Sequence, residues 1–369
     1  MRIVEVIAGF GAGGAETLLK NLSIGFESRN NEVLVVIIDQ FSDDITEINK
    51  INELHENGIK VVSLERKPSE NNLKMVFKIR KLLNEFKPNI VHIHSLLGAY
   101  YFLPFSFFSK IKFVQTIHNT KIYDKLIHKL FYQFIFKIKY KTIYCSEESR
   151  ISLKNHVGEG IVIDNGIPIH PNKNIREQIL DEYKIPKESC IILNVGRISV
   201  QKNQISLIKL IERLNEEFEN QNFQLLLCGM NYNDTYYAEL LKNIDTSPLK
   251  KNIHYIGVKN DVNHLMFSSD LFISSSIHEG LPITVLEAIN AGTPIVLSPI
   301  NEHLNVFSSV DGCYFPDENS VESYVDLFKK QKGIFSHDKE ELISKRQAII
   351  DKYHINTTVT KHLEYFKKI

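Results

Sequence analysis

The sequence predicts an α/β protein of two domains, each built around a parallel β-sheet covered by helices. Three observations carry this prediction. Short apolar runs alternate with helix-like segments along the chain, a turn-rich stretch near residue 165 separates two such series, and 369 residues are enough for two domains. Alternation of this kind is typical of βαβ units, whose strands form parallel sheets.

The first series of strands starts at the N-terminus. Its expected strands are apolar runs at Ile3–Ala8, Val33–Ile38, Lys60–Leu64, Ile90–Ile93, Lys112–Ile117 and Thr142–Cys145. Helical periodicity fills the intervals, as in Asn72–Phe86, where apolar residues recur every three or four positions. Glu5 interrupts the first run and a glycine-rich loop follows it, so we expect a strand there rather than a signal peptide.

The second series of strands follows a predicted hinge. The turn signal at Asp164–Pro168 divides the chain into domains at 1–167 and 168–353, and the sequence leaves open whether a last helix at 354–369 packs back on the first domain. The expected strands are Cys190–Val195, Gln224–Cys228, Ile253–Ile256, Asp270–Ser274 and Pro294–Ser298.

Composition excludes several classes of protein. Lys plus Arg number 44 and Asp plus Glu also number 44, so net charge gives no general attraction to nucleic acid. The four cysteines are far apart and form no paired motif, which is typical of reduced thiols in a cytoplasmic protein. No apolar stretch reaches the roughly 20 residues that span a bilayer.

The segment from 276 to 298 is the most informative part of the chain. Glu279 and Glu287 lie on either side of a helix start, where Pro282 suits the first turn, and Gly292 ends the helix. Glu279 is therefore expected in a loop after a strand and Glu287 inside the helix. We expect both carboxylates and the helix N-terminus to meet in one crevice at the carboxyl edge of the sheet, where open α/β folds bind ligands.

Two further segments have the chemistry of phosphate binding. Glycines at 9, 11, 13 and 14 follow the first strand and precede a helix, although their spacing fits the dinucleotide fingerprint poorly and a tight turn without a ligand is the alternative. Arg197 follows a strand and Lys202 precedes the next helix. A guanidinium and an ammonium at one sheet edge suit a diphosphate, while either side chain alone is more typical of a solvated cation.

With these motifs the chain resembles the retaining glycosyltransferases of family 4. Four features match in order: Gly13–Glu16, Gly196-Arg197 with Lys202-Asn203, Gly229 after a strand, and Glu279-Gly280 with Glu287-Ala288. The resemblance spans nearly the whole chain and implies the GT-B fold, an α/β architecture of two Rossmann-like domains whose parallel sheets face each other across a cleft. It also implies an N-terminal acceptor domain and a C-terminal domain for the nucleotide-sugar donor.

The resemblance assigns roles to individual residues. It implies that Glu279 contacts the donor sugar, that Arg197 and Lys202 hold the diphosphate, and that His118 approaches the reaction centre. Glu287 would bind the ribose hydroxyls. The implied donor-binding residues are Gly13, Gly14, Gly196, Gly229, Val258, Gly280, Leu281, Pro282 and Glu287.

The implied activity is transfer of a hexose or N-acetylhexosamine, with retention, from a nucleotide-diphosphate sugar to a sugar hydroxyl. Many nucleotide-sugar enzymes stabilise the leaving diphosphate with a metal bound by Asp-x-Asp, a motif absent from this sequence. Fixed cations and helix dipoles can take that role, so we expect no metal and no cofactor. A capsule, lipopolysaccharide or lipid-linked glycan acceptor fits the resemblance.

Other functions remain open at this stage. A sugar-nucleotide epimerase on the same fold would need no acceptor. A nicotinamide-dependent dehydrogenase would use Asp39 at the end of the second strand but gives no reason for Glu279 and Arg197 together. A binding subunit without activity is a third alternative.

Four features have a structural and a functional interpretation. His118 at a strand end is equally typical of a structural histidine. His92 and His94 share one face of a strand, but no third metal ligand is suggested. Glu16 can stabilise its own helix N-terminus. The lysine- and aromatic-rich segment 121–142 suits either a packed helix or peripheral contact with the anionic inner face of the cell membrane.

Overall fold

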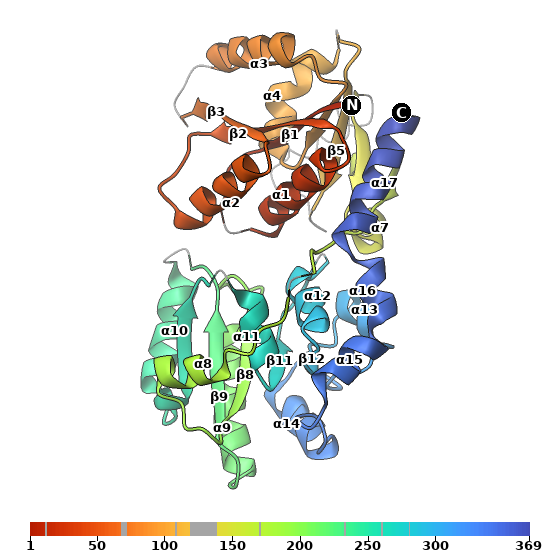
Figure 1. The fold of residues 1–369 in the computed structure, drawn as a ribbon. Coiled ribbons are helices and arrows are strands. Elements are labelled where there is room, and N and C mark those ends of the chain that lie inside the picture. Colours follow the sequence, from red (N-terminus) through yellow and green to blue (C-terminus); the bar gives the residue numbers. More distant parts are fainter. Residues whose placement is uncertain are drawn as a thin grey trace. The chain divides into compact units, whose positions relative to one another are not determined.

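The structure, a computed structural model, describes residues 1–11, 13–67, 72–107, 109–118, 139–169, 171–231, 234–259, 261–279 and 281–369. The chain divides into two compact units (Figure 1). Unit 1 comprises Met1–Pro168 and Tyr353–Ile369, and unit 2 comprises Ile169–Lys352. Each unit is an α/β layer structure around one parallel sheet, as the alternation in the sequence predicted.

Unit 1 contains a seven-stranded sheet in the order β3-β2-β1-β4-β5-β6-β7, and every neighbouring pair is parallel. Its central strands are buried on both faces, which explains why they are continuous apolar runs rather than alternating ones. The strands are β1 Arg2–Ile7, β2 Glu32–Asp39, β3 Lys60–Arg66, β4 Ile90–Ile93, β5 Lys112–Ile117, β6 Lys141–Tyr144 and β7 Gly160–Val162.

Unit 2 contains a six-stranded parallel sheet in the order β10-β9-β8-β11-β12-β13. The strands are β8 Cys190–Val195, β9 Phe223–Cys228, β10 Ile253–Gly257, β11 Leu271–Ser274, β12 Ile295–Leu297 and β13 Cys313–Tyr314. The sequence analysis did not predict β7 or β13. With three and two residues, these strands carry too short an apolar signal to be read from sequence.

Helices cover both sheets. Those of unit 1 are α1 Gly14–Glu27, α2 Ile45–Glu56, α3 Asn72–Phe86, α4 Leu96–Ser106, α7 Glu147–Val157 and α17 Ile355–Lys368. Those of unit 2 are α8 Arg176–Tyr183, α9 Gln204–Glu217, α10 Thr235–Thr246, the 3₁₀ turn η2 Lys250–Asn252, α11 Val262–Ser268, α12 Ile283–Asn290, α13 Asn301–Phe307, α14 Val321–Lys330, α15 Lys339–Lys345 and α16 Gln347–Lys352. Several begin at a side-chain cap: Asp234, for example, accepts from the Tyr237 amide at 3.0 Å.

The C-terminal helix α17 packs against α1 within unit 1 (Figure 1). The helices meet closely because Gly25 lacks a side chain: a Cβ there would lie 2.5 Å from Val359 Cγ2. Phe26 contacts Phe366, with ring centroids 5.8 Å apart, and Arg29 donates to Asn356 Oδ1 at 3.2 Å. The last segment of the chain thus completes the core of the first unit.

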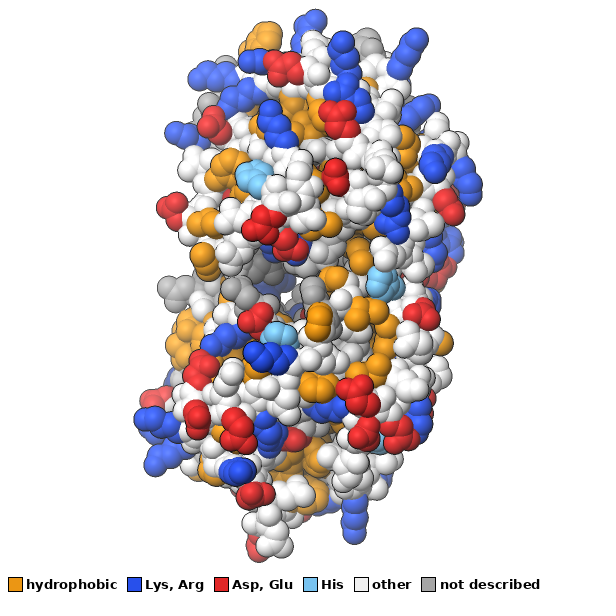
Figure 2. Space-filling model, in the orientation of Figure 1, with side chains coloured by type: hydrophobic (Ala, Val, Ile, Leu, Met, Phe, Trp, Pro, Cys, Tyr) orange, Lys and Arg blue, Asp and Glu red, His pale blue; other side chains and the backbone are white. Residues whose placement is uncertain are grey.

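The surface carries charges of both signs. Figure 2 shows Lys and Arg side chains interspersed with Asp and Glu, in keeping with the equal totals of the two kinds. Among the described residues, no helix is both long and apolar enough to traverse a bilayer.

Candidate functional site

The strand order of unit 2 places the predicted residues at a topological switch point. The sheet runs outward from β8 in one direction through β9 and β10, and in the other through β11. Gly196 and Arg197 follow β8, and Glu279 lies in the loop after β11. Open α/β sheets bind ligands where the carboxyl ends of two such strands diverge.

Lys202 and Glu279 form a buried ion pair at this point. Lys202 Nζ lies 2.5 Å from Glu279 Oε1, and the exposed fractions of the two side chains are 19% and 7%. Burial alone would raise the pKa of the Glu279 carboxyl, but attraction and hydrogen bonding by Lys202 outweigh it and lower the pKa below its usual value. Lys202 therefore favours the ionised form of a carboxyl that is buried inside the protein.

Hydrogen bonds to backbone atoms hold the two loops that carry this pair. The backbone carbonyl of Gln201 accepts from the Ile277 amide at 2.8 Å, and its side chain donates through Nε2 to the His278 carbonyl at 2.9 Å. Ser275 Oγ donates to the Lys202 carbonyl at 3.0 Å. Lys202 and Glu279 are thus positioned by their loops as well as by each other.

Two glycines form the backbone surface on which the Lys202 side chain packs. A Cβ on Gly196 would meet the Lys202 stem at 3.4 Å, so the lysine side chain lies directly over this residue. Gly229, after β9, has φ +154°, and a Cβ there would lie 2.0 Å from the Gly196 carbonyl oxygen. Only glycine allows the ends of β8 and β9 to approach so closely.

The remaining predicted residues of unit 2 differ in exposure. Arg197 and Val258 are exposed, the latter just after β10, whereas Leu281 and Pro282 are buried. Pro282 is the N-cap of α12. Gly280 lies outside the described residues.

Glu287 lies in the middle of α12 and is half-buried. Burial raises the pKa of its carboxyl to about 7. No hydrogen bond or ion pair of this carboxylate occurs among the described residues. A carboxyl with a strongly raised pKa is a common feature of functional sites.

The helix that follows the glycine loop of unit 1 begins earlier than the sequence indicated. α1 begins at Gly14, within the glycine pair, and Gly13 is its N-cap. The Glu16 carboxylate folds back over this turn: a Cβ on Gly13 would lie 2.0 Å from Glu16 Oε2. An acid near a helix N-terminus stabilises the helix by interacting with its dipole, and Glu16 is in the position that this structural role requires.

His118 belongs to a network of buried polar side chains in unit 1. It follows β5, and its Nε2 lies 3.0 Å from Nδ1 of His94. His94 and His92 in turn contact the two oxygens of Glu5, at 2.7 and 3.0 Å. The sequence analysis found no third ligand beside the His-x-His pair, but the fold supplies one, because β1 and β4 pair with Glu5 opposite His92.

Glu5 is the residue that sequence reasoning missed. Its signal was present: a charged side chain in an otherwise apolar strand that is buried on both faces. The ligand atoms of Glu5, His92 and His94 all lie within 4.8 Å of one another, a set that also matches metal-binding residue types.

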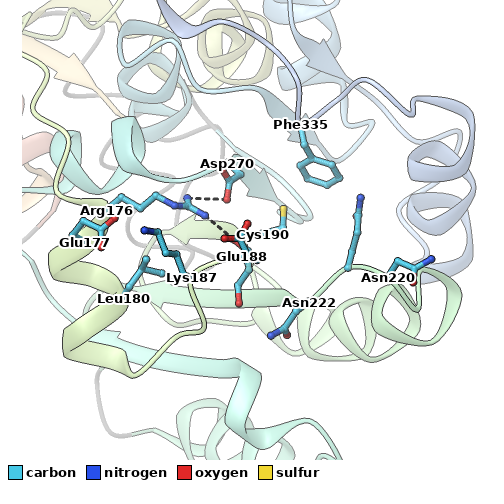
Figure 3. Close-up of a pocket in the computed structure, with 12 residues that line it drawn as sticks. Arg176, Glu177, Leu180, Lys187, Glu188, Cys190, Asn220, Asn222, Asp270 and Phe335 are labelled. Carbon is cyan, nitrogen blue, oxygen red and sulfur yellow. Dashed lines mark hydrogen bonds and ion pairs between the residues drawn. The ribbon is translucent and has the colours of Figure 1, made fainter.

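A pocket of about 510 Å³ occupies a different part of unit 2 (Figure 3). Cys190 and Asp270, which line it, lie at the amino ends of β8 and β11, at the edge opposite Gly196. Arg176 is held there by Asp270 at 2.9 Å and by the Ser189 carbonyl at 2.6 Å. No predicted site residue lines this pocket, and its arginine is already neutralised by a carboxylate.

Several solved structures and protein sequences are similar to this chain. The Anabaena protein HepE, solved in complex with UDP-glucose, superposes with a TM-score of 0.80 at 17% identity, covering 100% of both chains. An uncharacterized glycosyltransferase of Methanocaldococcus jannaschii is 26% identical over 271 residues, which are 66% of this chain and 65% of the relative. The alignment thus spans just under two thirds of that relative's length.

A further relative has a defined activity in its name. The UDP-Gal:alpha-D-GlcNAc-diphosphoundecaprenol alpha-1,3-galactosyltransferase of Escherichia coli is 27% identical over 277 residues, 69% of this chain and 68% of the relative. The family profile "Glycosyltransferase Family 4" matches residues 12–170, and "Glycosyl transferases group 1" matches residues 175–332. The two matches follow one another along both units, and the chain belongs to the group 1 glycosyltransferases of family 4, with the GT-B fold.

Proposed function

We propose that the protein is a retaining glycosyltransferase that moves a hexose or N-acetylhexosamine from a nucleotide-diphosphate sugar to a sugar hydroxyl. The observation that carries the proposal is the buried Lys202–Glu279 pair over Gly196, at the switch point of the unit 2 sheet. Such a site offers a cation for a diphosphate and a carboxylate for sugar hydroxyls within one rigid framework.

The chemistry that this site supplies is stabilisation of a leaving group. Breaking the bond between the sugar and the phosphate builds negative charge on the diphosphate. Lys202 faces that charge from a partly buried position, where electrostatic interactions are stronger than in water, and Arg197 lies in the same loop after β8. Glu279 holds the lysine in place before the donor arrives. We infer that these cations replace a metal ion.

Glu287 is proposed to bind the ribose of the donor. A carboxylate accepts hydrogen bonds from two neighbouring hydroxyls, and the partnerless carboxyl on α12 has this capacity once ionised. Because its pKa is about 7, roughly a tenth is ionised at pH 6 and roughly nine tenths at pH 8. Binding that requires the ionised form is therefore expected to weaken about tenfold from pH 8 to pH 6.

The proposed acceptor is a surface polysaccharide or a lipid-linked oligosaccharide. The similarity to an enzyme named for a diphosphoundecaprenol acceptor supports this class. Uridine is the base to test first, since a neighbour of the same fold binds UDP-glucose. Contact with an anionic membrane was predicted for 121–142, but residues 121–138 lie outside the described residues, so that contact stays a prediction.

The test starts with thermal-shift screening of wild-type protein against a panel of sugar nucleotides, because a ligand of the native state raises the unfolding temperature. Calorimetry then measures nucleotide affinity at pH 6 and pH 8 for wild type and Glu287→Gln. The wild type should lose affinity at pH 6, while the variant should show only the dependence due to the nucleotide's own phosphate.

Product analysis distinguishes transfer from its alternatives. The donor identified by the panel is incubated with and without glycan acceptors. A new α-linked glycoside supports the proposal, whereas epimerised donor without need of an acceptor supports the rival activity on the same fold. Absence of binding by every sugar nucleotide in the panel would refute the proposed function.

A further inference from the structure

Three buried side chains of unit 1 bring potential metal ligands together. Glu5 lies on β1, His92 lies on the neighbouring strand β4, and His94 directly follows that strand. All three side chains are 0% exposed. His92 Nδ1 lies 3.0 Å from Glu5 Oε1, His94 Nε2 lies 2.7 Å from Glu5 Oε2, and the two nitrogens lie 3.2 Å apart. One carboxylate and two imidazoles are ligands that zinc and related ions bind in proteins.

The sheet and the C-terminal helix hold these side chains in place. Glu5 and His92 are register partners in the parallel pair of β1 and β4. The period of two along a strand puts His92 and His94 on the same face. Helix α17 packs over His92, because the rings of Phe366 and His362 lie 5.3 and 5.4 Å from its ring. The ligands therefore belong to rigid elements rather than to loops, as a precise metal site requires.

The short distance between the two histidine nitrogens is poorly explained by hydrogen bonds to an ionised Glu5. A carboxylate only accepts, so His92 Nδ1 and His94 Nε2 would both carry a proton. Two such donors 3.2 Å apart form no hydrogen bond with each other. Two atoms bound tetrahedrally to zinc at about 2.0–2.1 Å lie roughly 3.3 Å apart, which matches the nitrogen pair. The nitrogen–oxygen distances are shorter, so the carboxylate would shift by about 0.3–0.6 Å to admit an ion.

The second nitrogen of each imidazole has an acceptor, as metal-binding histidines require. His92 Nε2 lies 2.7 Å from Thr116 Oγ1, and His94 Nδ1 lies 3.0 Å from His118 Nε2. Histidines that bind a metal almost always donate their other N–H to such a neighbour, which fixes the ring and its tautomer. The chain of polar contacts from Glu5 through His94 to His118 thus leaves the inner nitrogens free to turn lone pairs toward an ion.

Glu5 lacks a cationic partner within the part of the chain that the structure describes. Its ion pairs there are with the two histidines, and no lysine or arginine takes part. Buried ionised groups in proteins are usually paired with an opposite charge or bind a metal. A divalent ion would therefore supply the positive charge that the surrounding side chains do not.

We propose that Glu5, His92 and His94 bind one divalent transition-metal ion, for which zinc is the best match, and that this ion stabilises unit 1. Glu5 binds through both oxygens, so the site has four donor atoms, the number found in structural zinc sites. Catalytic zinc keeps an open position for water or substrate, whereas these side chains are fully enclosed. The ion is structural, and the inference does not depend on the proposed function.

Enclosure determines how such an ion responds to a chelator. While the protein is folded the ion leaves slowly, because its ligand atoms are shielded from water. Dialysis of the folded protein is therefore expected to leave it bound, whereas unfolding in the presence of chelator releases it.

A protonated carboxyl is the competing explanation for this cluster. Without an ion, burial raises the pKa of Glu5 against the opposing effect of His94, and burial lowers the pKa of His94 to about 3. A neutral Glu5 could then donate to His94 Nε2 and accept from His92 Nδ1, and no metal would be bound. The two explanations differ in metal content, which the test measures first.

The first experiment is elemental analysis of the full chain, purified without a metal-binding tag and grown with zinc, iron and manganese. Glu5→Gln and His94→Gln each remove one ligand. The matched control is His303→Gln, a histidine of unit 2 that is also 0% exposed. The wild type and the control should contain about one equivalent of metal, and each ligand variant below about a tenth, since losing a ligand costs more than the 10–100-fold typical of its hydrogen-bond partners.

Two measurements on the wild type keep the proposal testable if the ligand variants fail to fold. Protein unfolded in guanidinium with chelator is refolded with or without zinc. Zinc at 100 times its dissociation constant should raise the unfolding midpoint by about 5–10 °C. X-ray absorption at the zinc edge should then show nitrogen and oxygen ligands at about 2.0–2.2 Å and no sulfur at about 2.3 Å.

Thr116→Val tests the partner of His92 with little change of volume. Loss of the hydroxyl that accepts from His92 Nε2–H should lower zinc affinity by about 10–100-fold, measured by competition with a chelator during refolding. A threonine that only fills space would leave zinc affinity unchanged, and this result would contradict the assigned tautomer and the site.

Other outcomes would overturn the proposal outright. Wild-type protein with less than about a tenth of an equivalent of metal, and no uptake of zinc on refolding, would show that Glu5 is protonated instead. Full metal content in Glu5→Gln, equal losses in His303→Gln and His94→Gln, or sulfur ligands in the absorption spectrum would place the metal elsewhere. None of these measurements needs a donor or an acceptor, so they stand whether or not sugar transfer is found.

Discussion

Replacing Lys202 with methionine removes the cation from its buried pair with Glu279 and keeps a stem of similar length over Gly196. Removing one partner of a buried ion pair costs about 3–5 kcal/mol. The Lys202 side chain retains 19% exposure, so we expect the lower end of that range, about 3 kcal/mol. For a domain of the size of unit 2, this corresponds to a fall in the unfolding midpoint of about 6–12 °C.

The dependence of this loss on pH has a definite sign. In the wild type, the pKa of Glu279 in the folded protein lies below the ordinary value of 4.5, so the pair contributes stability above pH 4.5 and loses it as the pH falls through the lowered pKa. Without Lys202, burial remains as the largest influence and raises that pKa. The variant is therefore penalised most when Glu279 must stay ionised, and its deficit should be larger at pH 8 than at pH 5.

Thermal unfolding followed by circular dichroism at pH 5 and pH 8 measures both effects. The double variant Lys202→Met with Glu279→Gln is the control, because it removes both charges and should recover most of the stability lost at pH 8. A midpoint for Lys202→Met close to that of the wild type at both pH values would refute the account of the pair. A larger deficit at pH 5 than at pH 8 would refute the assigned sign.

Four further outcomes are expected. Gly229→Ala should destabilise the protein by at least about 2 kcal/mol in urea unfolding, since its Cβ would meet the Gly196 carbonyl oxygen at 2.0 Å; unchanged stability would contradict the close approach of the two strand ends. Arg197→Ala should reduce turnover by at least about 10²-fold with the fold intact, and near-normal turnover would remove this residue from the site. Dialysis against chelator should leave turnover unchanged, so activity that disappears and returns with a divalent metal would contradict catalysis by fixed cations alone. Gly25→Leu should lower stability by about 1–3 kcal/mol by pushing α17 off α1 at Val359, a loss that circular dichroism can measure.

The sequence was most informative where the signal is local. Cys190–Val195 was predicted as a strand and is one, because a fully buried parallel strand must be a continuous apolar run. The helix between Pro282 and Gly292 could likewise be located from its start and stop residues. The start of α1 was placed too late, since glycines at a helix N-terminus resemble a loop.

For the candidate site, too, the sequence predicted local features but not contacts between distant residues. The spacing of Glu279 and Glu287 around a helix start identified both as site candidates before any coordinates were considered. The sequence did not predict that Lys202 pairs with Glu279. It was equally consistent with Lys202 being a second solvated cation beside Arg197. The pairing joins residues 77 positions apart through two loops that meet only because β8 and β11 are neighbours in the sheet.

The amino-acid sequence by itself determined the class of fold, the order of most helices and strands, and the residue types available for binding a nucleotide sugar. These properties follow from periodicity, capping and turn chemistry within a few residues of each position. Tertiary structure alone decided that Glu5 lies against His94, 89 positions away, and that His118 completes their chain. The order of the strands in the sheet brings these residues together, and burial then changes their pKa values. No local sequence pattern encodes either effect.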